Sequence, residues 1–170
     1  MTTWRNMCPM TPEAIIIAIL GIFPHMSQNN RQCIIDRTPQ ITQQLQEVGE
    51  PIEPGAAVPP RELTAAVAFL ETHLGCDRFE GGNWGAPINA RQRHVPGNHM
   101  SAVRILVRGY QTCGTWEGSV MRFRTGLCNP RRQSSNLHIQ TVGPRYLRRV
   151  QDLQARMVAY RDRRLASNTH

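Results

Sequence analysis

Arginine is the residue type in this sequence that is best suited to bind a ligand. All 20 basic residues are arginine, none is lysine, and 11 of the arginines fall within residues 121–170. The guanidinium group is planar and always charged, so it can bind a phosphate through two parallel hydrogen bonds. Codon bias is the alternative explanation for the missing lysine. The candidate phosphate-binding residues are Arg122, Arg124, Arg131, Arg132, Arg145, Arg148, Arg149, Arg156, Arg161, Arg163 and Arg164.

The charge is distributed unevenly along the chain. Residues 1–120 contain nine arginines and ten acidic residues, whereas residues 121–170 contain 11 arginines and only Asp152 and Asp162 as acids. The two parts therefore carry formal charges of −1 and +9, which sum to the +8 of the whole chain. A nearly neutral body followed by a strongly basic segment is typical of proteins that bind a polyanion. We expect sequence-independent contacts with RNA or DNA phosphates, and a membrane surface is the less favoured alternative.

Other chemistries find little support in the sequence. A metal site could use His94, His99, Cys113 and Cys128, but these residues lack the paired spacing of zinc ligands. No histidine lies beside either cysteine in sequence, and no phosphate-binding loop motif is present. We therefore expect no enzymatic activity, no cofactor and no metal.

The cysteines do not form a recognisable framework. The chain has an odd number of them, five, with no Cys-x-x-Cys pair. Reduced and mostly buried thiols are the prediction, and one intermolecular disulfide in a symmetric dimer is the alternative. The five are Cys8, Cys33, Cys76, Cys113 and Cys128.

Capping signals predict a series of helices in the first half of the chain. Thr11-Pro12-Glu13 is a strong helix start, and Pro24 ends this helix after Phe23. Its ten-residue apolar run is too short to span a membrane, so we expect it to be buried. Ser27 can cap a second helix. Thr38-Pro39 then either kinks that helix or starts a third one, which Gly49 ends.

The second half continues in the same way after the Pro-rich connector 51–60. Helices are predicted over residues 61–74, 99–110, 116–127 and 144–165, and residues 76–98 and 128–143 are predicted to be irregular. Only Leu137 to Val142 alternates as a strand would. The last helix carries apolar side chains at spacings of 4, 3, 4 and 3, which predicts one buried face. These side chains are Tyr146, Val150, Leu153, Met157 and Tyr160. We expect residues 1–143 to form a helical domain and residues 144–170 an arginine-rich C-terminal helix or tail.

The order of features over residues 12–130 resembles the core (capsid) proteins of hepadnaviruses and of their non-enveloped fish relatives, the nackednaviruses. An apolar first helix ends in Phe23-Pro24, and Glu50-Pro51 precedes a Pro-rich step. The segment from Leu63 to Leu70 is similar to the ascending arm of the family's helical hairpin, and residues 98–110 to the descending arm. The segment from Thr112 to Trp116, with the helix that follows, resembles the family's helix at contacts between dimers.

This resemblance implies a mostly α fold, with a helical hairpin that forms a four-helix bundle on dimerisation, packed flanking helices and a long C-terminal helix. It implies a viral capsid protein that assembles into a closed icosahedral shell and packages viral RNA or DNA through its C-terminal arginines. The implied partners are further copies of the chain and viral nucleic acid, without membrane insertion. The implied location is the virion and the host cytoplasm or nucleus. The implied dimer interface is Leu63, Val67, Leu70, Val103, Leu106 and Val107, and the interface between dimers is Trp116, Leu127 and Pro130.

The alternative function is that of a small viral nucleic-acid-binding protein, either a helical coat protein or a silencing suppressor. Rod-shaped plant-virus coat proteins carry an Arg-Arg-Val-x-Asp string on the helix that contacts RNA. The segment from Arg148 to Asp152 resembles this string.

Overall fold

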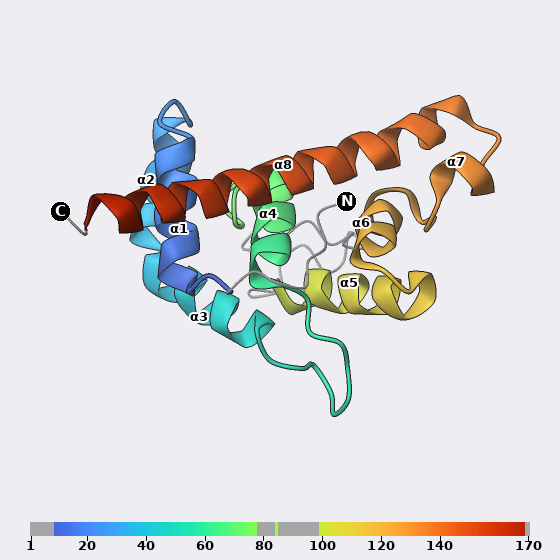
Figure 1. Ribbon diagram of the computed structural model, residues 1–170, viewed down its shortest axis with the longest axis horizontal. Coiled ribbons are helices and arrows are strands. Elements are labelled where there is room, and N and C mark those ends of the chain that lie inside the picture. The colour runs from blue at the N-terminus through green and yellow to red at the C-terminus, as the bar shows by residue number, and fades with distance from the viewer. Residues whose placement is uncertain (1–8, 78–83, 85–98, 169–170) are drawn as a thin grey trace.

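A computed structural model describes residues 9–77, 84 and 99–168 of the chain, and these residues form helices without any strand (Figure 1). The mostly α fold class predicted from the sequence is therefore confirmed. The helices are α1 (Pro12–Ile22), α2 (Gln28–Asp36), α3 (Thr38–Val48), α4 (Arg61–Thr72), α5 (His99–Cys113), α6 (Trp116–Thr125), α7 (Pro130–Gln133) and α8 (Leu137–Ser167).

Most of the predicted helix starts are confirmed, because local capping bonds set them. The Thr11 hydroxyl accepts a hydrogen bond from the Ala14 N–H at 3.2 Å, and the Ser27 hydroxyl accepts one from the Asn30 N–H at 3.2 Å. The choice left open at Thr38-Pro39 is decided in favour of two helices, since α2 ends at Asp36 and α3 begins at Thr38. The Thr115 hydroxyl caps α6 in the same manner.

The start of the last helix was predicted wrongly. Residues 137–142 are the first turns of α8 instead of a strand-like or irregular segment, and Pro144 lies inside the helix. The Asn136 side chain accepts hydrogen bonds from the N–H groups of His138 and Ile139, which gives α8 an N-cap seven residues earlier than predicted. Pro144 removes one helical N–H, but the surrounding packing keeps the helix continuous. The domain boundary predicted at residue 143 consequently falls inside α8.

Helix α8 crosses the whole molecule and holds it together (Figure 1). It packs on α1 towards its C-terminal end, on α4 in its middle, and on α6 and α7 towards its N-terminal end. The apolar side chains that face these helices, among them Val150, Leu153 and Met157, are buried. One continuous core therefore includes both the body and the last helix.

The side chains predicted to join two copies of the chain lie in this core. Leu63, Val67, Val103, Leu106 and Val107 are fully buried within the single chain, and Leu70 is half-buried. Helix α4 packs mainly on α1, α3 and α8, whereas α5 packs mainly on α6 and α3. The two helices thus do not lie along each other as the arms of a hairpin, because α8 and α6 cover the apolar faces that a hairpin dimer would use.

The cysteine prediction is also corrected by the structure. Cys33 is bonded to Cys76, and Cys113 is bonded to Cys128, with Cα–Cα distances of 5.9 and 5.4 Å. The first disulfide joins α2 to the segment after α4, and the second joins the end of α5 to the segment after α6. Partners 43 and 15 residues apart have no sequence signature, since only the fold brings them together. Cys8 lies outside the described residues.

Candidate nucleic-acid interface

The apolar face of α8 is anchored firmly in the body. Tyr146, Val150, Leu153 and Met157 are buried, as the spacing predicted, and Tyr160 is partly buried against the core. A Cβ atom at Gly21 would lie 2.3 Å from the Tyr160 ring, so the glycine allows α1 and α8 to touch. Because this face is buried, the side chains on the remaining surface of α8 are held in solvent on a rigid support.

Four arginines share one flank of α8. Arg145, Arg149, Arg156 and Arg163 follow one another at spacings of 4, 7 and 7 residues, which keeps them on the same side of the helix. At the helical rise they extend over about 27 Å. We call them the α8 arginine flank. Asp152 lies on the same flank, so the row is basic but not uninterrupted.

The arginines of α6 and α7 add to this surface at the N-terminal end of α8. Helices α6 and α7 both pack on α8 there, so their basic side chains come close to those of the first turns of α8. Two hollows result. The first, the α7–α8 hollow, has a volume of about 410 Å³ and is lined by Met121, Asn129, Arg131, Pro144, Leu147 and Arg148.

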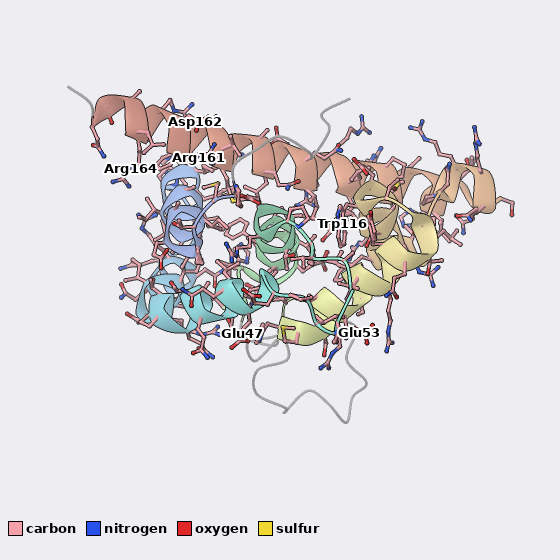
Figure 2. All side chains as sticks on the ribbon, turned by 60° about the horizontal axis from the view of Figure 1, so that its bottom comes forward. Glu47, Glu53, Trp116, Arg161, Asp162 and Arg164 are labelled. Atoms are coloured by element: carbon pink, nitrogen blue, oxygen red, sulfur yellow. A yellow bond between two sulfur atoms is a disulfide. The ribbon has the colours of Figure 1, made fainter. Side chains whose placement is uncertain are left out.

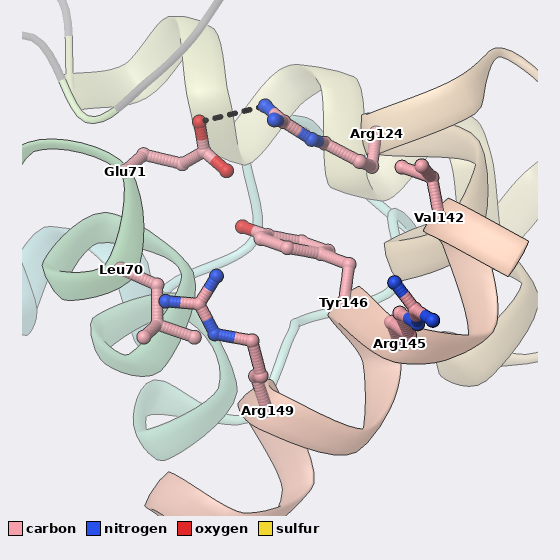
Figure 3. A pocket seen from close by; sticks show the side chains of 7 residues that line it. All are labelled: Leu70, Glu71, Arg124, Val142, Arg145, Tyr146 and Arg149. Carbon is pink, nitrogen blue, oxygen red and sulfur yellow. Dashed lines mark ion pairs between the residues drawn. The ribbon is translucent and has the colours of Figure 1, made fainter. Parts of the chain in front are cut away.

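The second hollow, which we call the α4–α8 hollow, lies between α4, α6 and α8 and has a volume of about 390 Å³ (Figure 3). It is lined by Leu70, Glu71, Arg124, Val142, Arg145, Tyr146 and Arg149. Glu71 forms an ion pair with Arg124, with 3.5 Å between Oε2 and Nη1. The guanidinium of Arg124 also lies 5.8 Å from the centre of the Tyr146 ring.

Tyr146 closes the inner side of the α4–α8 hollow. Its side chain is 5% exposed, and its hydroxyl oxygen points towards the Glu71 carboxylate (Figure 3). Burial raises the pKa of Tyr146 far above its ordinary value, and the negative charge of Glu71 and its hydrogen bonding with the hydroxyl raise it further. The hydroxyl therefore remains neutral and able to donate a hydrogen bond.

Besides Arg124, three of the predicted phosphate-binding arginines have contacts within the chain. Arg156 donates to the Ile22 carbonyl oxygen at 3.4 Å and lies over the Phe23 ring at 5.1 Å. Arg161 pairs with the neighbouring Asp162 at 2.8 Å near the C-terminal end of α8 (Figure 2). Arg122 donates to the Gly126 carbonyl oxygen at 3.4 Å. These contacts reduce the freedom of the three side chains without covering them completely.

Seven of the predicted arginines are exposed and form neither a side-chain hydrogen bond nor an ion pair with the described parts of the chain. They are Arg131, Arg132, Arg145, Arg148, Arg149, Arg163 and Arg164. Four of them, Arg131, Arg145, Arg148 and Arg149, line the two hollows on α7 and the N-terminal half of α8. The structure thus brings together residues that the sequence places in three separate segments.

The residues predicted to contact neighbouring dimers are only partly accessible. Trp116 is half-buried and its ring stacks on Tyr110 at 4.3 Å. Leu127 is half-buried, and Pro130 is buried. A Cβ atom at Gly143 would lie 2.7 Å from Pro130 Cγ, which shows how closely α7 approaches α8.

Two further alternatives from the sequence can be assessed in the structure. Cys113 and Cys128 are joined to each other, so neither thiol is free to hold a metal or to act as a nucleophile. Within the described residues, no group of three or more His, Cys, Asp or Glu side chains is suitably placed for a metal ion. His94 lies outside these residues. No helix in the described segments combines the length and apolar character that crossing a membrane requires.

Glu71 is a site residue that the sequence did not indicate. It is one acidic residue on a helix predicted to form a dimer contact, and only the crossing of α4 and α8 places it beside Tyr146 and Arg124. The comparisons with known proteins add no further residue, since no protein-family model, no curated protein and no solved structure matches this chain.

Proposed function

We propose that this chain binds nucleic acid through the arginines of α6, α7 and α8, with little dependence on base sequence. The observation that carries the proposal is the group of exposed arginines that have no carboxylate partner and are held on the outer surface of a docked helix. Like charges on one surface repel one another, and a polyanion that neutralises them removes this repulsion. RNA and DNA are the polyanions whose phosphates match the guanidinium geometry.

The rigidity of the surface supports this proposal. The buried face of α8 fixes the direction in which its arginines project, so binding would not require the helix to become ordered. Contacts between arginine and phosphate position a nucleic acid but contain no information about its bases. We therefore expect similar affinity for unrelated sequences and a strong dependence on salt.

The test is fluorescence anisotropy with labelled RNA and DNA oligonucleotides over a range of salt concentrations. If four arginines neutralise phosphates, the logarithm of the binding constant should fall with the logarithm of the salt concentration with a slope of about −3 to −4. Replacing Arg148 and Arg149 by Gln should weaken binding about tenfold and reduce the slope by about 2.

The matched control is the replacement of Arg104 and Arg108 by Gln. These two arginines are also exposed on a helix, so their loss changes the net charge equally, but they lie on α5. An equal loss of affinity in both double variants would show that net charge, rather than this surface, controls binding. Absence of binding at low salt would overturn the proposal.

The family resemblance supports a wider proposal. In that version the chain is a capsid protein that dimerises through a helical hairpin, assembles into a closed icosahedral shell and packages viral nucleic acid. The apolar side chains of the predicted hairpin are buried within one chain here. A dimer would therefore form only if α4 and α5 rearranged or if a different surface of the chain formed the dimer interface. Size-exclusion chromatography with negative-stain microscopy tests this version. Particles of uniform diameter would support it, and a species of one or two chains would contradict it.

The two disulfides bear on where a protein of this function would act. Disulfides persist in oxidising surroundings, including virion surfaces, and are rare in the cytosol and nucleus. Of the predicted locations, we therefore favour the virion over the host cytoplasm and nucleus. Mass measurement of the protein purified without reductant, before and after thiol alkylation, would reveal the paired cysteines.

A further inference from the structure

We propose that the α4–α8 hollow binds one phosphate group in its doubly charged, monoester form. For a phosphate at the end of a nucleic acid, this inference rests on the function proposed above. The same chemistry is offered by a free nucleoside monophosphate. Such a hollow would bind one terminal phosphate at a single site, whereas backbone phosphates would bind across the whole basic surface.

The charge of the hollow matches such a group. Three arginines and one glutamate line it, so their formal charges sum to +2. Glu71 is paired with Arg124 and neutralises that guanidinium, which leaves Arg145 and Arg149 without a carboxylate partner. A phosphate monoester carries nearly two negative charges at neutral pH, whereas a phosphate within the nucleic-acid backbone carries one.

The hydrogen-bond donors of the hollow also suit an anion. Arg145 and Arg149 are exposed side chains on neighbouring turns of α8, and each guanidinium can present two parallel N–H groups to phosphate oxygens. Arg124 uses one terminal nitrogen for Glu71 and retains further donors. These donors come from two helices that are packed on each other, so the site is already assembled in the free protein.

The Tyr146 hydroxyl adds a neutral hydrogen-bond donor to the hollow. It is a buried polar group whose partner, the Glu71 carboxylate, is also paired with Arg124, so a phosphate oxygen can replace Glu71 as its acceptor. It lies at the inner wall of the hollow and remains protonated, so it can donate to a phosphate oxygen. The flexible side chains of Arg145 and Arg149 flank the hollow and can rotate around an entering anion.

The size of the hollow permits more than an inorganic ion. A volume of about 390 Å³ is within the range of small-molecule sites, which is roughly 300–1,000 Å³. Leu70 and Val142 provide apolar wall, against which the sugar attached to a phosphate can pack. A terminal nucleotide of RNA or DNA, or a free nucleoside monophosphate, therefore fits the chemistry of the site.

The experiment compares one oligonucleotide carrying either a 5′-phosphate or a 5′-hydroxyl, together with adenosine 5′-monophosphate as a free ligand. We expect the phosphorylated oligonucleotide to bind about tenfold more tightly, since hydrogen bonds to charged groups are strong. Replacing Arg145 and Arg149 by Gln should remove this preference. Replacing Arg163 and Arg164 by Gln, which removes the same charge from the same helix outside the hollow, should preserve it.

Tyr146→Phe separates a binding role from a structural one. The variant keeps the buried ring and removes only the hydroxyl, so the chain should fold, but the preference for the 5′-phosphate should decrease. Equal affinity of the two oligonucleotides, with no binding of the free monophosphate, would overturn the site while leaving the proposed function intact. Binding of the monophosphate without any oligonucleotide binding would support the site and overturn the proposed function. Competition between adenosine 5′-monophosphate and the 5′-phosphorylated oligonucleotide would show that the hollow accepts both the free and the terminal phosphate.

Discussion

Tyr146 illustrates how one residue connects the core to the candidate site. Its ring belongs to the apolar face that docks α8, while its hydroxyl lies beside Glu71 at the wall of the α4–α8 hollow. Burial of the ring fixes the position of the hydroxyl, so the core determines the geometry of the site. The raised pKa of Tyr146 is the electrostatic consequence of this position.

The raised pKa predicts a loss of stability at alkaline pH. A tyrosine in the unfolded chain ionises near pH 10, whereas Tyr146 in the folded protein ionises only at higher pH. Its contribution is fully present below about pH 10 and is lost as pH rises from there towards the folded pKa, at up to about 1.4 kcal/mol per pH unit. Denaturant unfolding at a series of alkaline pH values would measure this loss.

Two features of the chain allow the change in unfolding free energy at alkaline pH to be assigned to Tyr146. The sequence has no lysine, so no ammonium group titrates in the same range. The Tyr146→Phe variant lacks the titrating hydroxyl and should lose less stability between pH 10 and 11. Identical pH dependence of the two proteins would show that Tyr146 is not buried as described.

At the scale of elements, α8 is both the main core helix and the support for the arginines. Its buried face packs on α1, α4 and α6, and its opposite surface carries the charged side chains. Removing residues 144–170 would therefore expose the core as well as delete the arginines. A loss of nucleic-acid binding after such a truncation could not be assigned to the arginines, so substitution of surface arginines is the better test.

Leu153→Ala should destabilise the protein strongly. Leu153 is 2% exposed in the middle of α8, and deleting a buried leucine leaves a cavity that costs about 2–5 kcal/mol. Gln151→Ala, two positions earlier on a less buried part of the same helix, is the control and should change the free energy of unfolding by less than about 1 kcal/mol. Equal effects in denaturant unfolding would mean that α8 does not contribute its apolar face to the core.

At the scale of the whole molecule, the disulfides connect segments that are distant in sequence. Cys33–Cys76 ties the N-terminal helices to the end of α4, and Cys113–Cys128 ties α5 to the segment leading to α7. Each bond restricts the unfolded chain, and the restriction grows with the length of the closed loop. The basic surface formed by α6, α7 and α8 thus lies on a covalently reinforced body.

Removing the disulfides should lower stability unequally. The chain-entropy relation gives about 4 kcal/mol for the pair 43 residues apart and about 3 kcal/mol for the pair 15 residues apart. Thermal unfolding of the Cys33→Ser/Cys76→Ser and Cys113→Ser/Cys128→Ser variants measures the two effects. A reductant should lower the Tm of the natural protein and leave a variant lacking all four cysteines unchanged. An unchanged Tm in both would contradict the pairing.

Features that depend on neighbouring residues could be predicted from the sequence. The caps at Thr11 and Ser27 and the buried face of the last helix follow from local hydrogen bonds and helical periodicity, so they could be predicted. The excess of arginine after residue 120 is likewise a property of composition. The N-cap of the last helix at Asn136 could not be predicted, because Pro144 indicated a helix start at that position. A proline inside a helix is tolerated only when the tertiary packing compensates for it.

The faces and the distant residues that meet are set by the three-dimensional packing of the helices. The apolar residues of α4 and α5 could equally have been covered by a second chain, and their actual cover by α8 and α6 depends on how the helices cross. The cysteine pairs and the meeting of Glu71, Arg124 and Tyr146 have the same origin. Contacts between segments tens of residues apart leave no spacing pattern in a single sequence, because their geometry is set by the packing of the whole core.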